Sequence, residues 1–315
     1  MRALVIRDNE LFVETRPDPV PGPGEVLVAV RAAGLNAADL LQRRGLYPAP
    51  PGWPVDIPGL ELAGDVRAWG SGVQGLSVGQ RVCAIVGGGA HATYCLVPTE
   101  HLLAVPPGVE ISNAGGFPEA FVTAFDALIC QARMEFGDRV LISGAAGGVG
   151  SAALQLVRAC GAVPIAVTRD DAPHKQLLQL GALEVATVET VTSVAPVDII
   201  LELVGAAHLQ TAMSVLAPHG RVVVIGIGSG AKVEIDLLSI MTKRLSLMGS
   251  TLRSRSREEK TALCMRVTAE LLPHWAAHRI HVPVSQHFRL EEAPAAYDAF
   301  ATSGKFGKIV LTMQP

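Results

Sequence analysis

The chain has 315 residues, of which 49% are hydrophobic and 17% are charged, and its formal net charge is −3 at pH 7. This length predicts two domains rather than one, and so apolar a composition excludes a disordered chain. The acidic balance and the absence of a long basic run in the sequence argue against a protein that binds nucleic acid.

The hydropathy of the chain argues against a membrane protein. Mean hydropathy is +0.36, yet no uninterrupted apolar run approaches the ~18 residues that a membrane helix needs. The first residues alternate and soon become charged, so the apolar block of a signal peptide is missing. We therefore expect a cytoplasmic protein that does not enter a membrane. An odd cysteine count without a CxxC pair argues against a disulfide framework and a structural zinc ribbon; the cysteines are Cys83, Cys95, Cys130, Cys160 and Cys264.

The first part of the chain, to about residue 115, reads as rich in strands and loops. Residues 26–31 form a strand candidate that follows a cluster of proline and glycine at 17–24. Short apolar runs separated by glycines follow, which favours a small barrel or sandwich. Residues 42–58 contain too many prolines for a helix or a central strand, so an irregular loop is expected there.

The pattern changes near residue 116 to strands that alternate with helices. This alternation predicts a parallel sheet with helices on both faces, and the C-terminal segment is expected to return and complete the first domain. The predicted domains are therefore 1–116, 117–255 and the return segment 256–315. Helices are expected at 117–130, 149–160, 175–180, 207–216, 258–272 and 293–302, and strands at 139–143, 163–168, 197–201, 221–225, 286–289 and 308–312.

The sharpest motif is the glycine-rich turn at 140–150, VLISGAAGGVG, which follows a strand and opens a helix. This placement is that of a dinucleotide-binding fingerprint, in which free N–H groups at the helix N-terminus face a pyrophosphate. Gly147 lets the backbone approach the phosphates, and the last glycine lets the helix pack on the strand. Ala145 replaces the usual first glycine, so an ordinary tight turn is the alternative. The expected cofactor contacts are Ala145, Gly147, Gly148 and Val149.

The end of the second strand of this unit indicates which nicotinamide cofactor binds. An NAD site usually ends that strand with an acid for the ribose 2′-OH, whereas here Thr168 and Arg169 stand there. A guanidinium can pair with a 2′-phosphate in a bidentate way, and Lys175 lies close in sequence. NADPH is therefore favoured, and NADH remains the alternative. In the other interpretation Arg169 is a solvated loop residue and Asp170 or Asp171 caps the next helix.

Further segments spread over the chain match one family in order and spacing. They are GLNAAD at 34–39, QRRGLYP at 42–48, PGLELAG at 58–64, GQRVCA at 79–84, FPEAFVTAF at 117–125, AAGGVG at 145–150, GSTLRSR at 249–255 and GKIVL at 307–311. With these segments the chain resembles the medium-chain dehydrogenase/reductase superfamily, and within it the zinc-independent quinone oxidoreductases, closest to the tumour-suppressor-inducible subgroup. The resemblance implies an α/β fold with a GroES-like β-rich catalytic domain and a Rossmann doubly wound cofactor domain.

The resemblance also bears on zinc. In zinc-dependent relatives a cysteine stands at the position of Asn36, and a histidine stands at the position of Leu60, next to Glu61. Leucine cannot ligate a metal, and an asparagine amide is a poor zinc ligand beside thiolate or imidazole. We therefore expect no zinc and no Lewis-acid catalysis.

Without a metal, the expected site acts by holding the quinone ring against the nicotinamide. The resemblance implies that this site lies in a cleft between the two domains. Asn36 and Tyr47 fall on the family's active-site segments, where an amide N–H, a phenol or a stacked ring can hold a quinone. The plainer alternatives are that Asn36 satisfies a turn and that Tyr47 only covers a loop. No histidine or carboxylate stands out as a general acid, so solvent is expected to supply the protons.

The resemblance implies further cofactor contacts, although Arg253 and Lys308 are equally well explained as structural ion-pair partners. The implied contacts are Thr123, Gly226, Ile227, Gly228, Arg253 and Lys308. One departure from the family pattern is that His91 and Thr93 stand where an aromatic residue and an acid are usual.

The sequence thus predicts an NADPH-dependent quinone oxidoreductase. The alternatives are reduction of an activated C=C bond in an enone or enoyl thioester, and a non-enzymatic role like that of the crystallin-like or RNA-binding relatives. Because relatives pair through an edge strand of the cofactor domain, a homodimer is expected, with residues 233–235 as the candidate edge.

Overall fold

A computed structural model describes residues 1–302 and 304–313. The chain divides into two compact units. Unit 1 contains Met1–Val122, Leu252–Ala276 and the described residues from His281 onward, and unit 2 contains Thr123–Thr251 and Ala277–Ile280. The main boundaries fall after residues 122 and 251, where the sequence placed them after residues 116 and 255.

Unit 1 is built around an extended sheet with the strand order β14-β15-β3-β4-β5-β7, in which β6 also pairs with β3. Alternate residues of β3 are buried, because one face of this strand packs on the core. β15 pairs antiparallel with β3, so the C-terminal segment completes this sheet. The strands are β1 Arg2–Arg7, β2 Glu10–Thr15, β3 Glu25–Gly34, β4 Glu61–Trp69, β5 Arg81–Ile85, β6 Tyr94–Pro98, β7 Leu102–Ala104, β14 Val284–Arg289 and β15 Lys308–Thr312.

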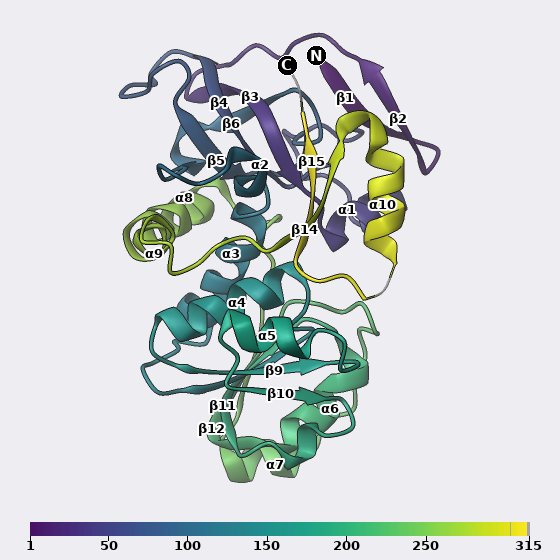
Figure 1. The fold of residues 1–315 in the computed structure, drawn as a ribbon, viewed down its shortest axis with the longest axis vertical. Coiled ribbons are helices and arrows are strands. Elements are labelled where there is room, and N and C mark those ends of the chain that lie inside the picture. The colour runs from purple at the N-terminus through teal and green to yellow at the C-terminus, as the bar shows by residue number, and fades with distance from the viewer. Residues whose placement is uncertain (303, 314–315) are drawn as a thin grey trace. The chain divides into compact units, whose positions relative to one another are not determined.

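Short helices surround the sheet of unit 1, and α10 packs against β15 and β2 (Figure 1). The buried core joins β3 and β4 to α10, whose Tyr297 is fully buried. The loop from residue 44 to residue 60 is irregular, as its prolines predict, but its expected start at residue 42 is wrong because Gln42 and Arg43 belong to the last turn of α1. The helices are α1 Ala37–Arg43, η1 Thr99–His101, α2 Ile111–Ala114, α3 Pro118–Phe125, α8 Arg257–Arg266, η4 Val267–Leu271, α9 Leu272–Ala276, η5 Leu290–Glu292 and α10 Ala293–Ala301.

Unit 2 is a parallel sheet with the strand order β10-β9-β8-β11-β12-β13, and this confirms the predicted doubly wound fold. Helices α4 and α5 lie on one face of the sheet, and α6 and α7 lie on the other (Figure 1). The middle residues of the central strands β8 and β11 are apolar and buried because both faces of the sheet are covered. The elements are η2 Asp126–Gln131, β8 Arg139–Ser143, α4 Gly148–Ala159, β9 Val163–Thr168, α5 His174–Leu180, β10 Glu184–Thr187, η3 Val191–Ser193, β11 Val197–Glu202, α6 Ala206–Ser214, β12 Leu216–Val224, α7 Leu237–Lys243 and β13 Ser246–Gly249.

The order of the strands in unit 2 creates a switch point between β8 and β11. The chain moves outward from β8 through β9 to β10, and then returns to β11 on the other side of β8. In open sheets of this kind a crevice forms at the carboxyl ends of the two central strands, and ligands bind there.

The predicted edge strand at 233–235 is wrong. These residues lie outside any strand, and the edge next to β12 is β13, which follows the crossover through α7. Three residues are too few to show a strand period, whereas a return through a helix places the next strand parallel to the last one.

The sequence argued against a membrane-spanning helix and against disulfide bonds. No helix in the described part of the chain has both the length and the apolar character that a bilayer-spanning segment needs. All five cysteines carry free thiols.

Candidate cofactor and substrate sites

The glycine-rich turn lies at the switch point of unit 2, between β8 and α4. Gly144 has a φ of +63°, and Gly147 stands at the N-cap of α4, where no side chain caps the helix. A Cβ on Gly150 would lie 2.5 Å from the carbonyl oxygen of Gly144, so this position requires glycine. A Cβ on Gly147 would meet nothing closer than 3.4 Å. The first N–H groups of α4, from Gly148 and Val149, therefore form an open anion-binding terminus.

A second turn, after β12, lies beside the loop that follows β11. A Cβ on Gly226 would overlap the carbonyl oxygen of Leu203, so the two turns approach more closely than any other residue would permit. The N–H of Ser229 donates to the carbonyl oxygen of Val204 at 2.8 Å. Ile227, between the two predicted glycine contacts, has 58% of its surface exposed. The turn is thus fixed by its contacts with the loop after β11, while the side chain of Ile227 is exposed to solvent.

Glu202, which sequence reasoning missed, fixes the loop after β11. The carboxylate is fully buried, and its Oε1 accepts hydrogen bonds from Ser143 Oγ at 2.7 Å and from the N–H groups of Val204 and Gly205 at 2.6 and 2.7 Å. Its Oε2 has no hydrogen-bond partner among the described residues. The available signal was an acid at the end of the apolar run Ile199–Leu201, three residues before Gly205.

The end of β9 carries the residues predicted to select the cofactor. The hydroxyl of Thr168 donates to the carbonyl oxygen of Asp170 at 2.8 Å. The side chain of Arg169 is 68% exposed, and its Nε lies 3.8 Å from the Asp170 carboxylate, which is a weak surface pair. Lys175 is exposed on the first turn of α5. Two cations therefore remain available near this strand end.

The alternative for this loop, a helix cap by Asp170 or Asp171, does not occur. Helix α5 begins after Pro173, and no side chain caps it. Asp170 Oδ1 accepts instead from the N–H of Ala172 at 3.2 Å, so this carboxylate closes a local turn.

In unit 1, Asn36 belongs to a buried polar cluster at the N-cap of α1. Its Nδ2 donates to Glu61 Oε1 at 3.0 Å and to the carbonyl oxygen of Gly34 at 3.3 Å, and its Oδ1 accepts from Lys308 Nζ at 2.7 Å. Both amide hydrogens therefore have protein acceptors. A substrate carbonyl would have to displace one of them, and the long contact to Gly34 is the weaker.

Lys308 and Glu61 form a buried ion pair, with a distance of 2.5 Å between Nζ and Oε1. The side chain of Lys308 is 3% exposed and that of Glu61 is fully buried. Lys308 Nζ also donates to the carbonyl oxygen of Leu35 at 2.8 Å. The ammonium group therefore has three protein acceptors, which are Glu61 Oε1, Asn36 Oδ1 and the carbonyl oxygen of Leu35. Its predicted contact with the cofactor stays a prediction.

Arg253 holds the loop that carries Tyr47. Its Nη1 donates to the backbone oxygen of Tyr47 at 2.8 Å, its Nε to that of Gly87 at 2.9 Å, and its Nη2 to Gln42 Oε1 at 2.6 Å. The guanidinium also lies 5.0 Å from the centre of the Tyr47 ring. Burial raises the pKa of the Tyr47 phenol, so the hydroxyl stays protonated at neutral pH. The predicted contact of Arg253 with the cofactor is likewise still a prediction.

Glu119, at the start of α3, is a second residue that sequence reasoning missed. Its backbone N–H donates to Glu61 Oε2 at 2.8 Å, while its own carboxyl group is half-buried. Burial, followed by the negative charge of Glu61, raises the pKa of Glu119 to about 8. The sequence showed an acid after a helix-opening proline, but burial that depends on other segments is not visible there.

Two other residues singled out in the sequence, Thr123 as a cofactor contact and His91 as a departure from the family pattern, lie in buried positions. Thr123 is in α3 and is 7% exposed. His91, which departs from the family pattern, is fully buried, with its Nδ1 3.0 Å from the Tyr297 hydroxyl and its Nε2 3.4 Å from the carbonyl oxygen of Gly34. Burial lowers the pKa of His91, so a neutral ring serves the core of unit 1.

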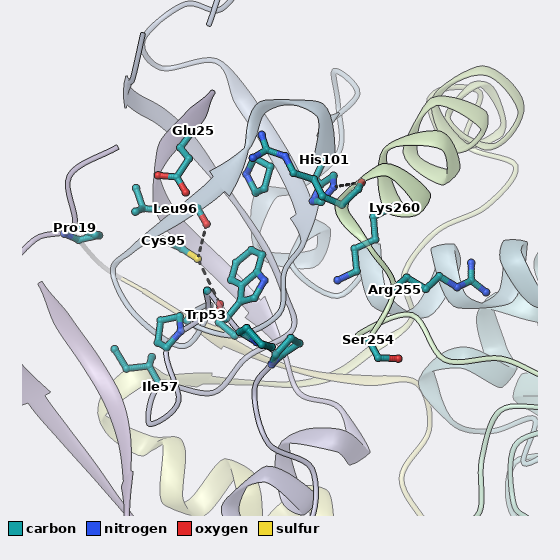
Figure 2. A pocket seen from close by; sticks show the side chains of 18 of the residues that line it. Pro19, Glu25, Trp53, Ile57, Cys95, Leu96, His101, Ser254, Arg255 and Lys260 are labelled. Carbon is teal, nitrogen blue, oxygen red and sulfur yellow. Dashed lines mark hydrogen bonds between the residues drawn. The ribbon is translucent and has the colours of Figure 1, made fainter. Parts of the chain in front are cut away.

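A pocket of about 620 Å³ opens within unit 1 beside the proline-rich loop. Figure 2 shows Trp53 and Ile57 on one side of this pocket, and His101 and Lys260 on the other. The ring of Trp53 lies so close to Gly87 that a side chain there would overlap it. The pocket therefore has an apolar wall and a polar wall, and neither Asn36 nor Tyr47 is among its lining residues.

The side chains around Glu61 bear on whether the described part of the chain can hold a metal ion. No group of three or more His, Cys, Asp or Glu side chains there is arranged to hold a metal ion. At Glu61 the neighbouring side chains are the amide of Asn36 and the ammonium of Lys308, which do not form a zinc donor set.

Comparisons with known proteins agree with this architecture. Residues 22–107 match the family model of the alcohol dehydrogenase GroES-like domain, and residues 148–267 match that of the zinc-binding dehydrogenase. The quinone oxidoreductase of Lama guanicoe is 30% identical over 308 residues, which cover 94% of this chain and 91% of that protein. The human quinone oxidoreductase is 30% identical over 307 residues, with the same coverage. The solved quinone oxidoreductase from Thermus thermophilus, also determined in complex with NADPH, is 32% identical with a TM-score of 0.84, covering 99% of this chain and 100% of that one.

Proposed function

This chain belongs to the quinone oxidoreductases of the medium-chain dehydrogenase/reductase superfamily and is an oxidoreductase, and from that premise we propose that it reduces quinones with NADPH and without a catalytic metal. The observation that carries this proposal is the open N-terminus of α4 at the switch point of the parallel sheet. Membership of the tumour-suppressor-inducible subgroup stays a prediction.

The residues of unit 2 suit a phosphorylated dinucleotide. Gly148 and Val149 offer backbone N–H groups to a pyrophosphate, Gly147 leaves space for its approach, and the buried Ala145 keeps the turn compact. Arg169 supplies a guanidinium that is held only weakly by its neighbour and can pair with a 2′-phosphate, with Lys175 as a second cation. This supports NADPH over NADH.

The remaining contacts of the cofactor are proposed at the second turn and on α3. Gly226 and Gly228 permit close approach of a ribose, and Ile227 offers an apolar surface to the nicotinamide. Thr123 is proposed beside the same ring. NADPH, when bound, supplies a hydride.

Residues of unit 1 bind and orient the quinone by hydrogen bonds and ring stacking, without a metal ion. Tyr47 presents a protonated phenol and an aromatic ring, and Asn36 can donate to a carbonyl oxygen in exchange for its long hydrogen bond to Gly34. Arg253 and Lys308 keep these two residues in place, because each is hydrogen-bonded to one of them. Oriented donors of this kind stabilise the negative charge that develops on a quinone oxygen as it accepts a hydride.

Zinc independence rests on the chemistry of the donor set. Leu60 offers no ligand atom, and the amide of Asn36 is already shared between an acid and an ammonium group. Activity that survives dialysis against a chelator supports this proposal, whereas activity that is lost and then restored by zinc overturns it.

The proposed function is tested by titrating the purified chain with NADPH and NADH, followed by steady-state assays with 1,4-benzoquinone, 9,10-phenanthrenequinone and crotonyl-CoA. Tighter binding of NADPH and turnover of the quinones are expected. Turnover of crotonyl-CoA alone would establish reduction of an activated C=C bond instead. Binding of neither nucleotide would overturn the proposal, and a salt-sensitive shift of RNA in a gel would then favour the non-enzymatic role.

We also propose that the protein is a cytoplasmic homodimer that pairs through the edge strand β13, on which Leu247 is partly exposed. Unpaired strand edges readily pair with another chain. Light scattering that gives the mass of a single chain would overturn this assembly.

A further inference from the structure

The pocket of about 620 Å³ beside the proline-rich loop has no part in the proposed reaction. All of its lining residues belong to unit 1, and the proposed quinone contacts Asn36 and Tyr47 are not among them. Its volume falls within the range of about 300–1,000 Å³ that is usual for sites of small organic ligands. The side chains that line it indicate which kind of molecule it can take.

One wall of this pocket is apolar and already ordered. The ring of Trp53 lies against Gly87, where a Cβ would come within 2.5 Å of the ring, and the N–H of Trp53 donates to the carbonyl oxygen of Pro50 at 3.2 Å. Pro51 and Pro54 of the same loop also line the pocket. Because proline fixes the backbone dihedral φ, such a loop loses little freedom when a ligand binds. The wall therefore presents an indole on which a flat ring can stack.

The opposite wall carries two polar side chains that are almost completely buried. Lys260 on α8 is 7% exposed, and His101 is 2% exposed. Lys260 Nζ donates to the carbonyl oxygen of Arg253 at 2.8 Å, and its ammonium group forms no ion pair with any residue that the structure describes. His101 Nε2 lies 3.3 Å from the carbonyl oxygen of Arg257, whereas its Nδ1 has no hydrogen-bond partner in the described part of the chain. Both side chains therefore keep hydrogen-bonding capacity that the protein does not use.

The charges around the pocket favour an anion at Lys260. A buried ammonium group without an acid partner is unfavourable, because it has lost water and gained only one carbonyl oxygen in return. Arg255 and Arg257 also line the pocket, whereas Glu25 is the single acid among the described lining residues. Figure 2 shows Glu25 on the opposite side of the pocket from Lys260, and its Oε2 accepts from the N–H of Gly22 at 2.9 Å. An anionic ligand group would supply the counter-charge that the protein does not.

We propose that this pocket is a second ligand site of the protein, and that it takes a flat aromatic ring carrying a carboxylate, with the ring on Trp53 and the carboxylate at Lys260. Figure 2 shows the Lys260 side chain extending from α8 with its ammonium end toward the side on which Trp53 lies. Since both residues line one cavity, a single rigid molecule can contact both. The site does not depend on the proposed quinone reduction, and it persists if the chain reduces no quinone.

The test is calorimetric titration of the full chain with 2-naphthoate and with 2-naphthamide, which has the same ring without the charge. The wild type is expected to bind the acid on the order of 10-fold more tightly than the amide, because hydrogen bonds between two charged groups are the stronger ones. Saturating NADPH should leave both affinities unchanged. Competition with NADPH would place the probe at the cofactor site and would overturn the proposal.

Variants of the two walls separate the ring from the charge. Lys260→Met should bind the acid and the amide equally, with the wild-type affinity for the amide, which also shows that the pocket is still folded. Lys260→Arg should retain the preference for the acid. Trp53→Leu should weaken both probes by the same factor, on the order of 10-fold. The controls Lys232→Met and Trp69→Leu change exposed residues outside the pocket and should alter neither affinity.

The remaining outcomes all count against the site. No binding of 2-naphthoate to the wild type, or equal binding of the acid and the amide, overturns the proposal. So does a preference for the acid that survives in Lys260→Met. If Trp53→Leu and Trp69→Leu weaken binding alike, the probe adsorbs to exposed aromatic surface and the proposed site is wrong.

Discussion

The buried ion pair between Lys308 and Glu61 offers a quantitative test of how unit 1 is held together. Lys308→Met removes the ammonium but leaves the carboxylate of Glu61 buried, with only the Asn36 amide and the N–H of Glu119 as partners. Removing one member of a buried pair typically costs about 3–5 kcal/mol. Because two hydrogen bonds to Glu61 remain, we expect a loss near the lower end, about 3 kcal/mol.

Tryptophan fluorescence during urea unfolding measures this loss in unit 1 alone. The three tryptophans, Trp53, Trp69 and Trp275, all lie in unit 1. With a urea dependence of about 2 kcal/mol per molar, the midpoint should fall by about 1.5 M.

A matched control and a double variant make the result decisive. Arg44→Met alters an exposed cation of unit 1 and should change stability by no more than about 0.5 kcal/mol. Combining Lys308→Met with Glu61→Gln should cost less than the sum of the single changes, since no unpaired charge then remains buried. The reasoning is refuted if Lys308→Met behaves like Arg44→Met, or if the two changes simply add.

Three further predictions concern the proposed sites. Arg169→Ala should raise the KM for NADPH by on the order of 10-fold and leave that for NADH unchanged, because only NADPH carries the 2′-phosphate; an unaltered ratio removes this assignment. Tyr47→Phe should lower kcat/KM for quinones several-fold, by roughly the value of one hydrogen bond, and an unchanged value would exclude a required hydroxyl but not stacking. Gly150→Ala should both destabilise unit 2 and abolish NADPH binding, whereas Gly147→Ala, whose Cβ has space, should melt like the wild type and lose affinity only; equal melting of the two variants by circular dichroism would contradict this.

The parts of the fold that were predicted correctly depend on information that is local in the sequence. The turn at Gly147 shows itself through glycine spacing between an apolar strand and an amphipathic helix, and α5 ends at Gly181, which adopts the left-handed conformation at φ +106°. Alternating strands and helices leave few ways to arrange a sheet, so the parallel order of unit 2 followed from the pattern.

The parts that could not be predicted depend on contacts between distant segments. Glu61, Glu119 and Lys308 are far apart in the chain and meet only because β15 pairs with β3 beside β4. A raised carboxyl pKa is a property of that burial, so Glu119 could not be distinguished in the sequence from any acid in a first helical turn. The three backbone and side-chain partners of Arg253 were hidden for the same reason.

The discontinuous composition of unit 1 has a consequence for how the protein is made. Unit 1 is assembled from three stretches of chain, and its final strand, β15, ends only at Thr312, whereas nearly all of unit 2 lies in one continuous stretch. During translation, unit 2 can therefore fold on the ribosome before β15 is made, while the edge of β3 that pairs with β15 is still unpaired. Nascent chains that stall before β15 is made would expose that edge, which chaperones and proteases can recognise.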